Sequence, residues 1–138
     1  MSPVQGNVRT RPRRTVLVVE DALTTRCILE QFFARAGCDV LQAADVETAL
    51  RRLKTALIDA VILDLRLGDG RSGLEVLQQM RLEDRLANLP VVVLTGVSEV
   101  APDEEEIINK YGAHLLYKRL GYREVVDRLE RIISKAAA

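Results

Sequence analysis

The sequence predicts an α/β fold in which a five-stranded, parallel, doubly wound sheet carries five helices. Short apolar, β-branched runs alternate along the chain with segments whose apolar residues recur at helical spacing. The runs are almost wholly apolar, as is typical of strands that are buried on both faces. Strands that alternate with helices favour parallel pairing through right-handed crossovers, and this places helices on both faces of the sheet.

The first strand and helix follow a basic N-terminal segment. Residues 1–14 contain four arginines and no apolar period, so we expect a flexible basic arm before a domain at 15–135. Residues 16–19 predict a strand, and 24–36 predict a helix that Gly37 closes. The expected inner face of this helix consists of Ile28, Leu29, Phe32, Phe33 and Ala36.

Two further strand–helix units repeat the pattern without a sequence repeat. Residues 39–42 predict a strand, and Asp45 is the expected N-cap of the helix that follows. Residues 60–63 predict the third strand, and the third helix comes after a glycine-rich loop. The apolar residues that mark the two helices are Ala49, Leu50, Leu53, Leu74, Val76, Leu77 and Met80.

The last two units complete the alternation. Residues 91–94 predict a strand, and 104–111 predict a helix that ends at Gly112. Residues 115–117 predict the fifth strand, and 124–134 predict a closing amphipathic helix. The inner face of that helix consists of Val125, Val126, Leu129, Ile132 and Ile133.

Composition excludes several classes of protein. The 138 residues, 48% hydrophobic and 29% charged, suit one globular domain and not a disordered chain. Lys and Arg together number 20, as do Asp and Glu, so no overall field attracts nucleic acid or an anionic membrane. Cys27 and Cys38 match no disulfide or metal spacing, and no apolar run is long enough for a membrane span or secretory signal. We therefore expect free thiols and a cytoplasmic location.

Polar side chains stand at the ends of four predicted strands. Glu20 and Asp21 follow the first strand, Asp64 the third, Thr95 the fourth and Lys118 the fifth. In a doubly wound sheet the carboxyl ends of the strands form one functional edge. Three neighbouring carboxylates repel one another unless a cation joins them, and their hard oxygen atoms favour Mg²⁺.

This set of residues suits phosphoryl transfer. Lys118 supplies a positive charge and Thr95 a hydroxyl donor for a phosphoryl group, while Asp64 can act as a nucleophile that forms an aspartyl phosphate. Each residue alone is explained more simply as a helix cap or a solvated surface charge. Their occurrence together at four strand ends favours a functional site.

Four segments carry a family resemblance across residues 15–135. They read VLVVEDALTTR at 16–26, AVILDLRLGDGRSGLEVL at 60–77, VVVLTG at 91–96 and GAHLLYKR at 112–119. In this order they resemble the receiver domain of two-component response regulators. The resemblance implies strand order 2-1-3-4-5 in a flavodoxin-like three-layer sandwich.

The resemblance also implies a signalling role without enzymatic activity. The domain would accept a phosphoryl group on Asp64 from a sensor histidine kinase or a histidine phosphotransfer protein. Nothing after residue 138 supplies a DNA-binding or enzymatic domain, so we expect a stand-alone regulator that signals through protein contacts, with no nucleic-acid or membrane partner. Whether the chain is full length or a fragment of a longer protein is left open. The downstream target and self-association as a homodimer are left open.

Individual roles follow from the same resemblance. Asp21 would bind Mg²⁺ directly and Glu20 largely through water, with the Asp64 carboxylate and the backbone carbonyl of Arg66 as further ligands. Thr95 would be the switch hydroxyl that follows the phosphoryl group. Lys118 would bind the phosphoryl oxygens.

The sequence departs from the family pattern at three places. Arg119 stands where receiver domains have a proline in a cis bond, so this loop must take a trans path or bear a costly cis bond. Gly68 replaces a usual proline, and the loop from it to Gly73 is one residue longer than is common. Leu115 stands at the aromatic switch position, but Tyr117 has the same strand parity and is a candidate substitute.

Two alternative functions stay open. A haloacid-dehalogenase-like phosphatase would need a second Asp two residues after the nucleophile, where this chain has Arg66. A pseudo-receiver would keep the fold as an interaction module without phosphorylation.

The Gly-rich stretch 68–73 matches the pattern GxGxxG. It lacks the acidic residue of a dinucleotide site and the GK[ST] of a P-loop, and loop flexibility explains it. The lone His114 has no metal-ligand partner in the sequence pattern.

Overall fold

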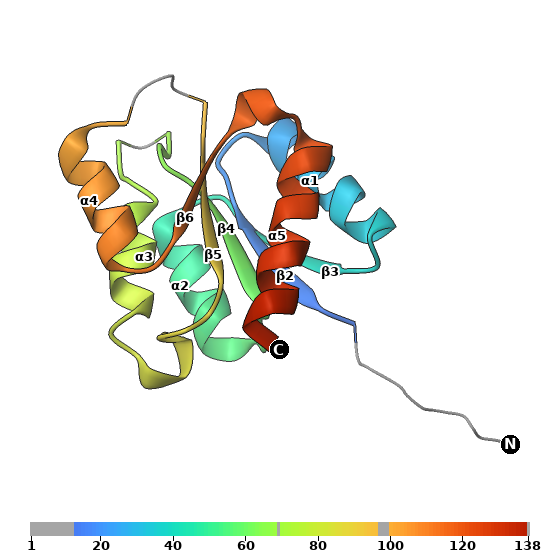
Figure 1. Ribbon diagram of the computed structural model, residues 1–138, viewed down its shortest axis with the longest axis horizontal. Helices are drawn as coiled ribbons and strands as arrows, with labels where there is room; N and C mark the ends of the chain where they lie inside the picture. Colours follow the sequence, from blue (N-terminus) through green and yellow to red (C-terminus); the bar gives the residue numbers. More distant parts are fainter. Residues whose placement is uncertain (1–12, 69, 97–99, 138) are drawn as a thin grey trace, which may run out of the picture.

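The computed structural model describes residues 13–68, 70–96 and 100–137, and within them a parallel sheet forms the centre of the molecule (Figure 1). Its strands are β2 (Thr15–Val19), β3 (Asp39–Ala43), β4 (Ala60–Asp64), β5 (Val91–Thr95) and β6 (His114–Tyr117). They lie in the order β3-β2-β4-β5-β6, so β3 and β6 form the two edges. The predicted order 2-1-3-4-5 is confirmed.

Helices cover both faces of the sheet (Figure 1). The helices are α1 (Leu23–Arg35), α2 (Val46–Thr55), α3 (Leu74–Met80), α4 (Pro102–Lys110) and α5 (Tyr122–Ala137). Helices α1 and α5 pack on one face, and α2, α3 and α4 pack on the other. Two 3₁₀ turns that the sequence pattern did not predict complete the described elements: η2 (Asp84–Leu86) and η3 (Lys118–Leu120). The three-layer doubly wound architecture is confirmed.

Alternation along the strands divides the interior into two cores. In β5, Val91 and Val93 belong to the core beneath α2, α3 and α4, while Val92 and Leu94 belong to the core beneath α1 and α5. All residues of β4 and β5 are buried. These runs are apolar because successive side chains point to opposite faces and a helix covers each face.

The helix ends show where local chemistry sets the boundaries. The Asp45 side chain caps α2 by accepting a hydrogen bond from the Thr48 N–H at 2.7 Å, as predicted. Gly37 follows α1 with φ of +86°, a conformation that favours glycine. Helix α1 ends at Arg35 and Ala36 is exposed, so the prediction that Ala36 belongs to the inner face of this helix was wrong.

Helices α4 and α5 both begin two residues earlier than predicted. Proline has no backbone N–H, but the N–H of the first helical residue has no partner within the helix, so proline costs nothing at that position. Pro102 accordingly starts α4. The expected starts at Glu104 and Glu124 relied on acidic and apolar patterns and overlooked Pro102 and Tyr122.

The N-terminal arm falls mostly outside the described residues, which begin at Arg13. Arg13 itself contacts the sheet edge: its guanidinium lies 2.9 Å from the Asp39 carboxylate and donates to the Cys38 carbonyl at 3.1 Å.

Both cysteines are free thiols, as expected. Cys38 is buried and Cys27 half-buried, and burial raises the pKa of the Cys38 thiol. Among the helices that the structure describes, none is both long and apolar enough to cross a bilayer.

Candidate functional site

Three carboxylates meet where β2 and β4 end. Glu20 and Asp21 directly follow β2, and Asp64 is the last residue of β4. One oxygen of each carboxylate lies within 4.8 Å of the others. Glu20 and Asp64 are 2% and 7% exposed, whereas Asp21 is exposed at the mouth of the cluster. The predicted convergence of these acids is therefore present in the fold.

Lys118 reaches into this acidic cluster from the end of β6. Its Nζ lies 2.9 Å from Glu20 Oε1 and 3.3 Å from Asp64 Oδ2. Burial alone would lower the pKa of Lys118, but the hydrogen bond to Glu20 and the charges of Asp64 and Glu20 outweigh it, so its pKa is raised. The lysine is thus held as a cation between two buried carboxylates.

Backbone N–H groups fix the orientation of the two buried carboxylates. Glu20 Oε2 accepts a hydrogen bond from the Ala22 N–H at 3.1 Å, and Asp64 Oδ1 accepts one from the Arg66 N–H at 3.2 Å. Each carboxylate therefore uses one oxygen for the backbone and the other for Lys118. The orientation of both carboxylates is therefore already fixed before any ligand binds.

Arg26 of α1 hydrogen-bonds to the backbone of the acid pair Glu20–Asp21. Arg26 Nη1 donates to the backbone carbonyls of Glu20 at 2.8 Å and Asp21 at 3.1 Å, while its Nε donates to Gln42 Oε1 at 3.0 Å. Gln42 in turn donates to Glu30 at 2.8 Å. These contacts of Arg26 were not predicted, because an apolar-face pattern places Arg26 simply among the polar residues of the helix.

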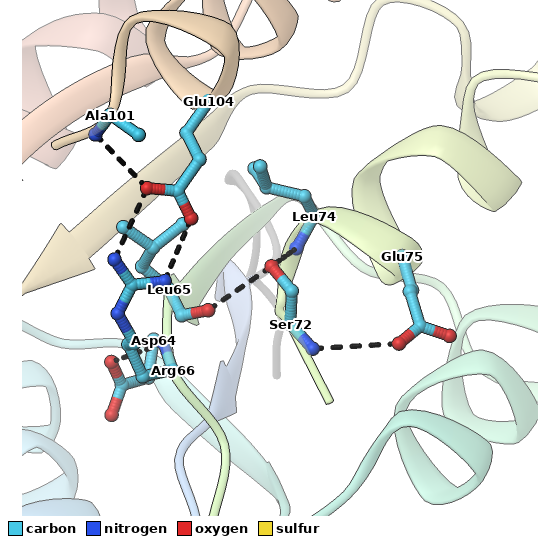
Figure 2. Close-up of polar contacts among 8 residues, drawn as sticks. All are labelled: Asp64, Leu65, Arg66, Ser72, Leu74, Glu75, Ala101 and Glu104. Atoms are coloured by element: carbon cyan, nitrogen blue, oxygen red, sulfur yellow. Dashed lines mark hydrogen bonds and ion pairs between the residues drawn. The ribbon is translucent and has the colours of Figure 1, made fainter. Parts of the chain in front are cut away.

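The loop after Asp64 is closed by a serine (Figure 2). Ser72 Oγ donates to the Leu65 carbonyl at 3.2 Å and accepts from the Leu74 N–H at 3.1 Å, while the Ser72 N–H donates to Glu75 Oε2 at 3.4 Å. Arg66 and Ser72 also form an isolated antiparallel bridge. These contacts join the end of β4 to the start of α3.

Two glycines of this loop lie close to the carboxylate cluster. A Cβ on Gly73 would lie 2.1 Å from the backbone oxygen of Asp64, and a Cβ on Gly68 would lie 2.2 Å from Asp21 Oδ2. Gly73 is also buried. Loop flexibility is therefore the wrong explanation for Gly73, because this position needs glycine for close packing.

Thr95 lies at the same edge of the sheet as the acids. It ends β5 with 1% exposure, one position beyond Leu94, which pairs with Asp64 in register. Thr95 itself pairs with Tyr117 of β6. The structure thus places the hydroxyl residue on the strand beside the candidate nucleophile.

The end of β6 shows how the chain accommodates its unusual residues. Leu115 is half-buried against the core beneath α2, α3 and α4. Tyr117 is half-buried too, and the Arg119 guanidinium lies 4.5 Å from the centre of its ring. Every peptide bond among the described residues is trans, so the loop after Lys118 takes the trans path.

The residues present fit a hard divalent cation. Mg²⁺ prefers oxygen ligands and is usually held by one or two carboxylates together with water and phosphate oxygens. Glu20, Asp21 and Asp64 supply such oxygens at one place, with an exposed side open to a ligand. The Arg66 backbone adjoins Asp64 through the N–H contact described above.

Comparison with known proteins agrees with this architecture. Residues 16–130 match the family model described as response regulator receiver domain. The chain is 29% identical over 128 residues to the alkaline phosphatase synthesis transcriptional regulatory protein PhoP of Bacillus subtilis, covering 89% of this chain and 50% of that protein. It is 31% identical over 85 residues to sporulation initiation phosphotransferase F of the same organism, covering 62% of this chain and 66% of that protein.

Solved structures show the same fold. The chemotaxis protein CheY4 of Vibrio cholerae superimposes with a TM-score of 0.78 at 26% identity, covering 87% of this chain and 98% of that one. The chain spans between 25% and 50% of the length of four curated relatives that include PhoP. Because the family model matches residues 16–130, most of this chain, the chain belongs to the receiver domain family of two-component response regulators.

Proposed function

We propose that this receiver domain accepts a phosphoryl group on Asp64. The observation that carries the proposal is the double contact of Lys118 with Asp64 and Glu20 inside a cluster of three carboxylates. A carboxylate beside a fixed cation can act as a nucleophile toward an anionic phosphoryl group, because the cation offsets the repulsion between them. Thr95 supplies a hydroxyl at the same edge.

The chemistry balances with a phosphohistidine donor. An oxygen of the Asp64 carboxylate attacks the phosphorus, the P–N bond breaks, and its electron pair stays on the imidazole nitrogen, which then takes a proton. The product is an acyl phosphate on Asp64. The ammonium of Lys118 neutralises charge on the transferring group, and the Arg66 N–H keeps the Asp64 carboxylate in place.

We assign a Mg²⁺ site to the acid cluster. Asp21, exposed at the mouth, is the direct ligand, with Asp64 and the backbone carbonyl of Arg66 beside it. Glu20 already accepts hydrogen bonds from Lys118 and the Ala22 N–H, which favours a role through water. When bound, the ion would supply positive charge that stabilises the phosphoryl oxygens during transfer.

The proposed donor is a sensor histidine kinase or a histidine phosphotransfer protein. One relative of this chain is named a sporulation initiation phosphotransferase and another a transcriptional regulatory protein. We propose that the domain works as a signalling module rather than as an enzyme, with output through protein contacts. Its cytoplasmic location stays a prediction, and its downstream target is left open.

Intact-mass spectrometry tests the proposal. Incubation with a small phosphodonor such as acetyl phosphate and Mg²⁺ should add one phosphoryl group to the wild-type protein. Asp64→Asn keeps the shape of the side chain and an oxygen for the Arg66 N–H, yet it should not be labelled. The matched control Asp127→Asn changes an exposed acid of α5 and should label like the wild type. Equal labelling of Asp64→Asn would refute the assignment.

Two measurements, intact mass and phosphate release, decide between the remaining functions. A pseudo-receiver would gain no mass under these conditions even with its fold intact. A phosphatase of the haloacid-dehalogenase type needs a proton donor two residues after the nucleophile, and the Arg66 guanidinium there is engaged with Glu104. Rapid release of phosphate from an added phosphomonoester would favour that class.

A further inference from the structure

The side chain of Arg66 starts beside the candidate phosphoacceptor. Its backbone is held in place by the N–H contact with Asp64 Oδ1 at 3.2 Å and by the bridge with Ser72. Because the Arg66 N–H contacts the Asp64 carboxylate itself, the Arg66 side chain leaves the backbone close to that carboxylate. Figure 2 shows the Arg66 side chain running from this point towards Glu104.

The guanidinium of Arg66 forms a two-pronged ion pair with Glu104 on α4. Nη1 lies 2.7 Å from Oε2, and Nη2 lies 3.1 Å from Oε1. The same carboxylate accepts the Ala101 N–H at 3.1 Å, so it also closes the first turn of α4. The Glu104 side chain is 15% exposed, and the hydrogen bond from Arg66 lowers its pKa. The Arg66 side chain is 53% exposed, and the strength of the contact comes from its two-pronged geometry, which makes it stronger than a single charged hydrogen bond.

This ion pair is a principal attachment of the first turn of α4. Ile108, in the second half of the helix, is its buried residue, whereas Ala101, Pro102 and Asp103 are exposed. Among the described residues at the start of the helix, the apolar contact with the core comes from Val100, which is only partly buried. The contact with Arg66 links this first turn to the loop that follows Asp64.

We propose that the Arg66 side chain is a further phosphoryl-binding group, which Glu104 holds away until Asp64 is phosphorylated. This inference rests on the proposed function. A phosphoryl group carries more negative charge than a carboxylate and offers several oxygens to the planar fork of an arginine. Its arrival on Asp64 creates a stronger partner for a guanidinium that starts two residues away.

The consequence is a link between the phosphorylation site and α4. When Arg66 turns to the phosphoryl group, Glu104 loses its ion pair and the first turn of α4 is released. Glu104 then opposes phosphoryl binding, because that binding must first break the ion pair. A ligand shifts such an equilibrium only by its difference in affinity for the two states.

Binding of beryllofluoride with Mg²⁺, measured by calorimetry, tests this competition. Glu104→Gln keeps an oxygen for the Ala101 N–H but removes the charge, and it should bind beryllofluoride about three- to tenfold more tightly. Arg66→Gln should bind it more weakly than the wild type. The double variant should match Arg66→Gln, because Glu104 acts only through Arg66. Glu124→Gln, which removes an exposed ion pair of α5, should bind like the wild type.

Hydrogen exchange supplies an independent measurement. Amides of the first turn of α4 should exchange faster in Glu104→Gln than in the wild type, and beryllofluoride should raise exchange there in the wild type alone. Unchanged or weaker beryllofluoride binding by Glu104→Gln, with the thermal midpoint preserved, would overturn the inference. Failure of the wild type to bind beryllofluoride would instead overturn the proposed phosphorylation of Asp64.

Discussion

Gly73 packs directly against the backbone of Asp64, so closely that a Cβ on residue 73 would lie 2.1 Å from the Asp64 carbonyl oxygen and 3.1 Å from its carbonyl carbon. The neighbouring atoms are backbone and cannot rotate away. The start of α3 is thereby set against the residue that we propose as phosphoacceptor. Close contact of this kind makes the loop sensitive to a single methyl group.

Gly73→Ala should therefore destabilise the fold. We expect a loss of about 1–3 kcal/mol in the free energy of unfolding, because the added methyl group forces a backbone shift in a packed region. Urea denaturation measures this loss. Gly96→Ala is the control and should change stability little, since among the residues that the structure describes its Cβ would meet only the Lys118 side chain, at 3.6 Å. Similar stability of the two variants would show that the loop relaxes around the methyl group.

Asp21→Asn should weaken Mg²⁺ binding. The loss of one charged oxygen from the cluster of three carboxylates leaves less negative charge to hold the ion, so we expect at least a tenfold weaker affinity. Calorimetric titration with MgCl₂ measures it. Asp103→Asn removes an exposed carboxylate of α4 and should bind like the wild type. Unchanged affinity in Asp21→Asn would remove this residue from the metal site.

The stability of the fold should depend on pH through Asp45. The hydrogen bond from the Thr48 backbone N–H holds the pKa of Asp45 below its ordinary value of 3.8. Because the folded-state pKa is the lower one, the stabilisation is complete above the unfolded-state pKa and is lost as pH falls through the folded-state pKa. Asp45→Ala should cost about 1 kcal/mol near neutral pH, from loss of the N-cap.

Denaturation of wild type and Asp45→Ala across acid pH checks this dependence. The difference in unfolding free energy should shrink as the pH falls below 3.8. Asp45→Asn keeps the N-cap acceptor without the charge and should lose less stability than Asp45→Ala near neutral pH. A difference that stays constant with pH would mean that the charge of Asp45 does not contribute.

Phosphorylation should be transmitted through Thr95 to β6. Thr95 is buried at the end of β5 and pairs with Tyr117, so a movement of its hydroxyl towards a phosphoryl group reaches β6 directly. Amide chemical shifts of Gly96 and residues 115–117 should change with beryllofluoride and Mg²⁺. These changes should disappear in Thr95→Ala. Changes confined to Asp21, Asp64 and Lys118 would mean that the domain binds the ligand without switching through β6.

The sequence was sufficient to predict the sheet and the cluster of charged residues. Each strand is a short apolar run, and parallel strands bring their carboxyl ends to one edge, so Glu20, Asp21, Asp64 and Lys118 were expected together. The structure places all four in that arrangement. The cluster was predictable because the parallel sheet itself brings the strand ends together, whatever the conformations of the individual side chains.

Contacts that depend on side-chain reach were not predictable in this way. Arg66 and Glu104 lie 38 positions apart, and nothing in their local patterns indicates that a loop and a helix terminus face each other. The contact of Arg26 with the backbone of the acid pair is likewise invisible to helical periodicity, which only separates polar from apolar faces. The packing of Gly73 against Asp64 depends on the path of the loop in three dimensions.

The edge strand β6 has a consequence for how copies of this chain meet one another. An uncovered strand edge can add the edge of another molecule and so begin aggregation. Here the groove beside residues 114–116 is lined by Arg128, Arg131 and Lys135 of α5, with Glu124 as the acid that two of them share. Two copies that approach edge to edge would bring these positive charges together. Their repulsion discourages growth of the sheet from one molecule into the next, and it weakens as salt screens the charges.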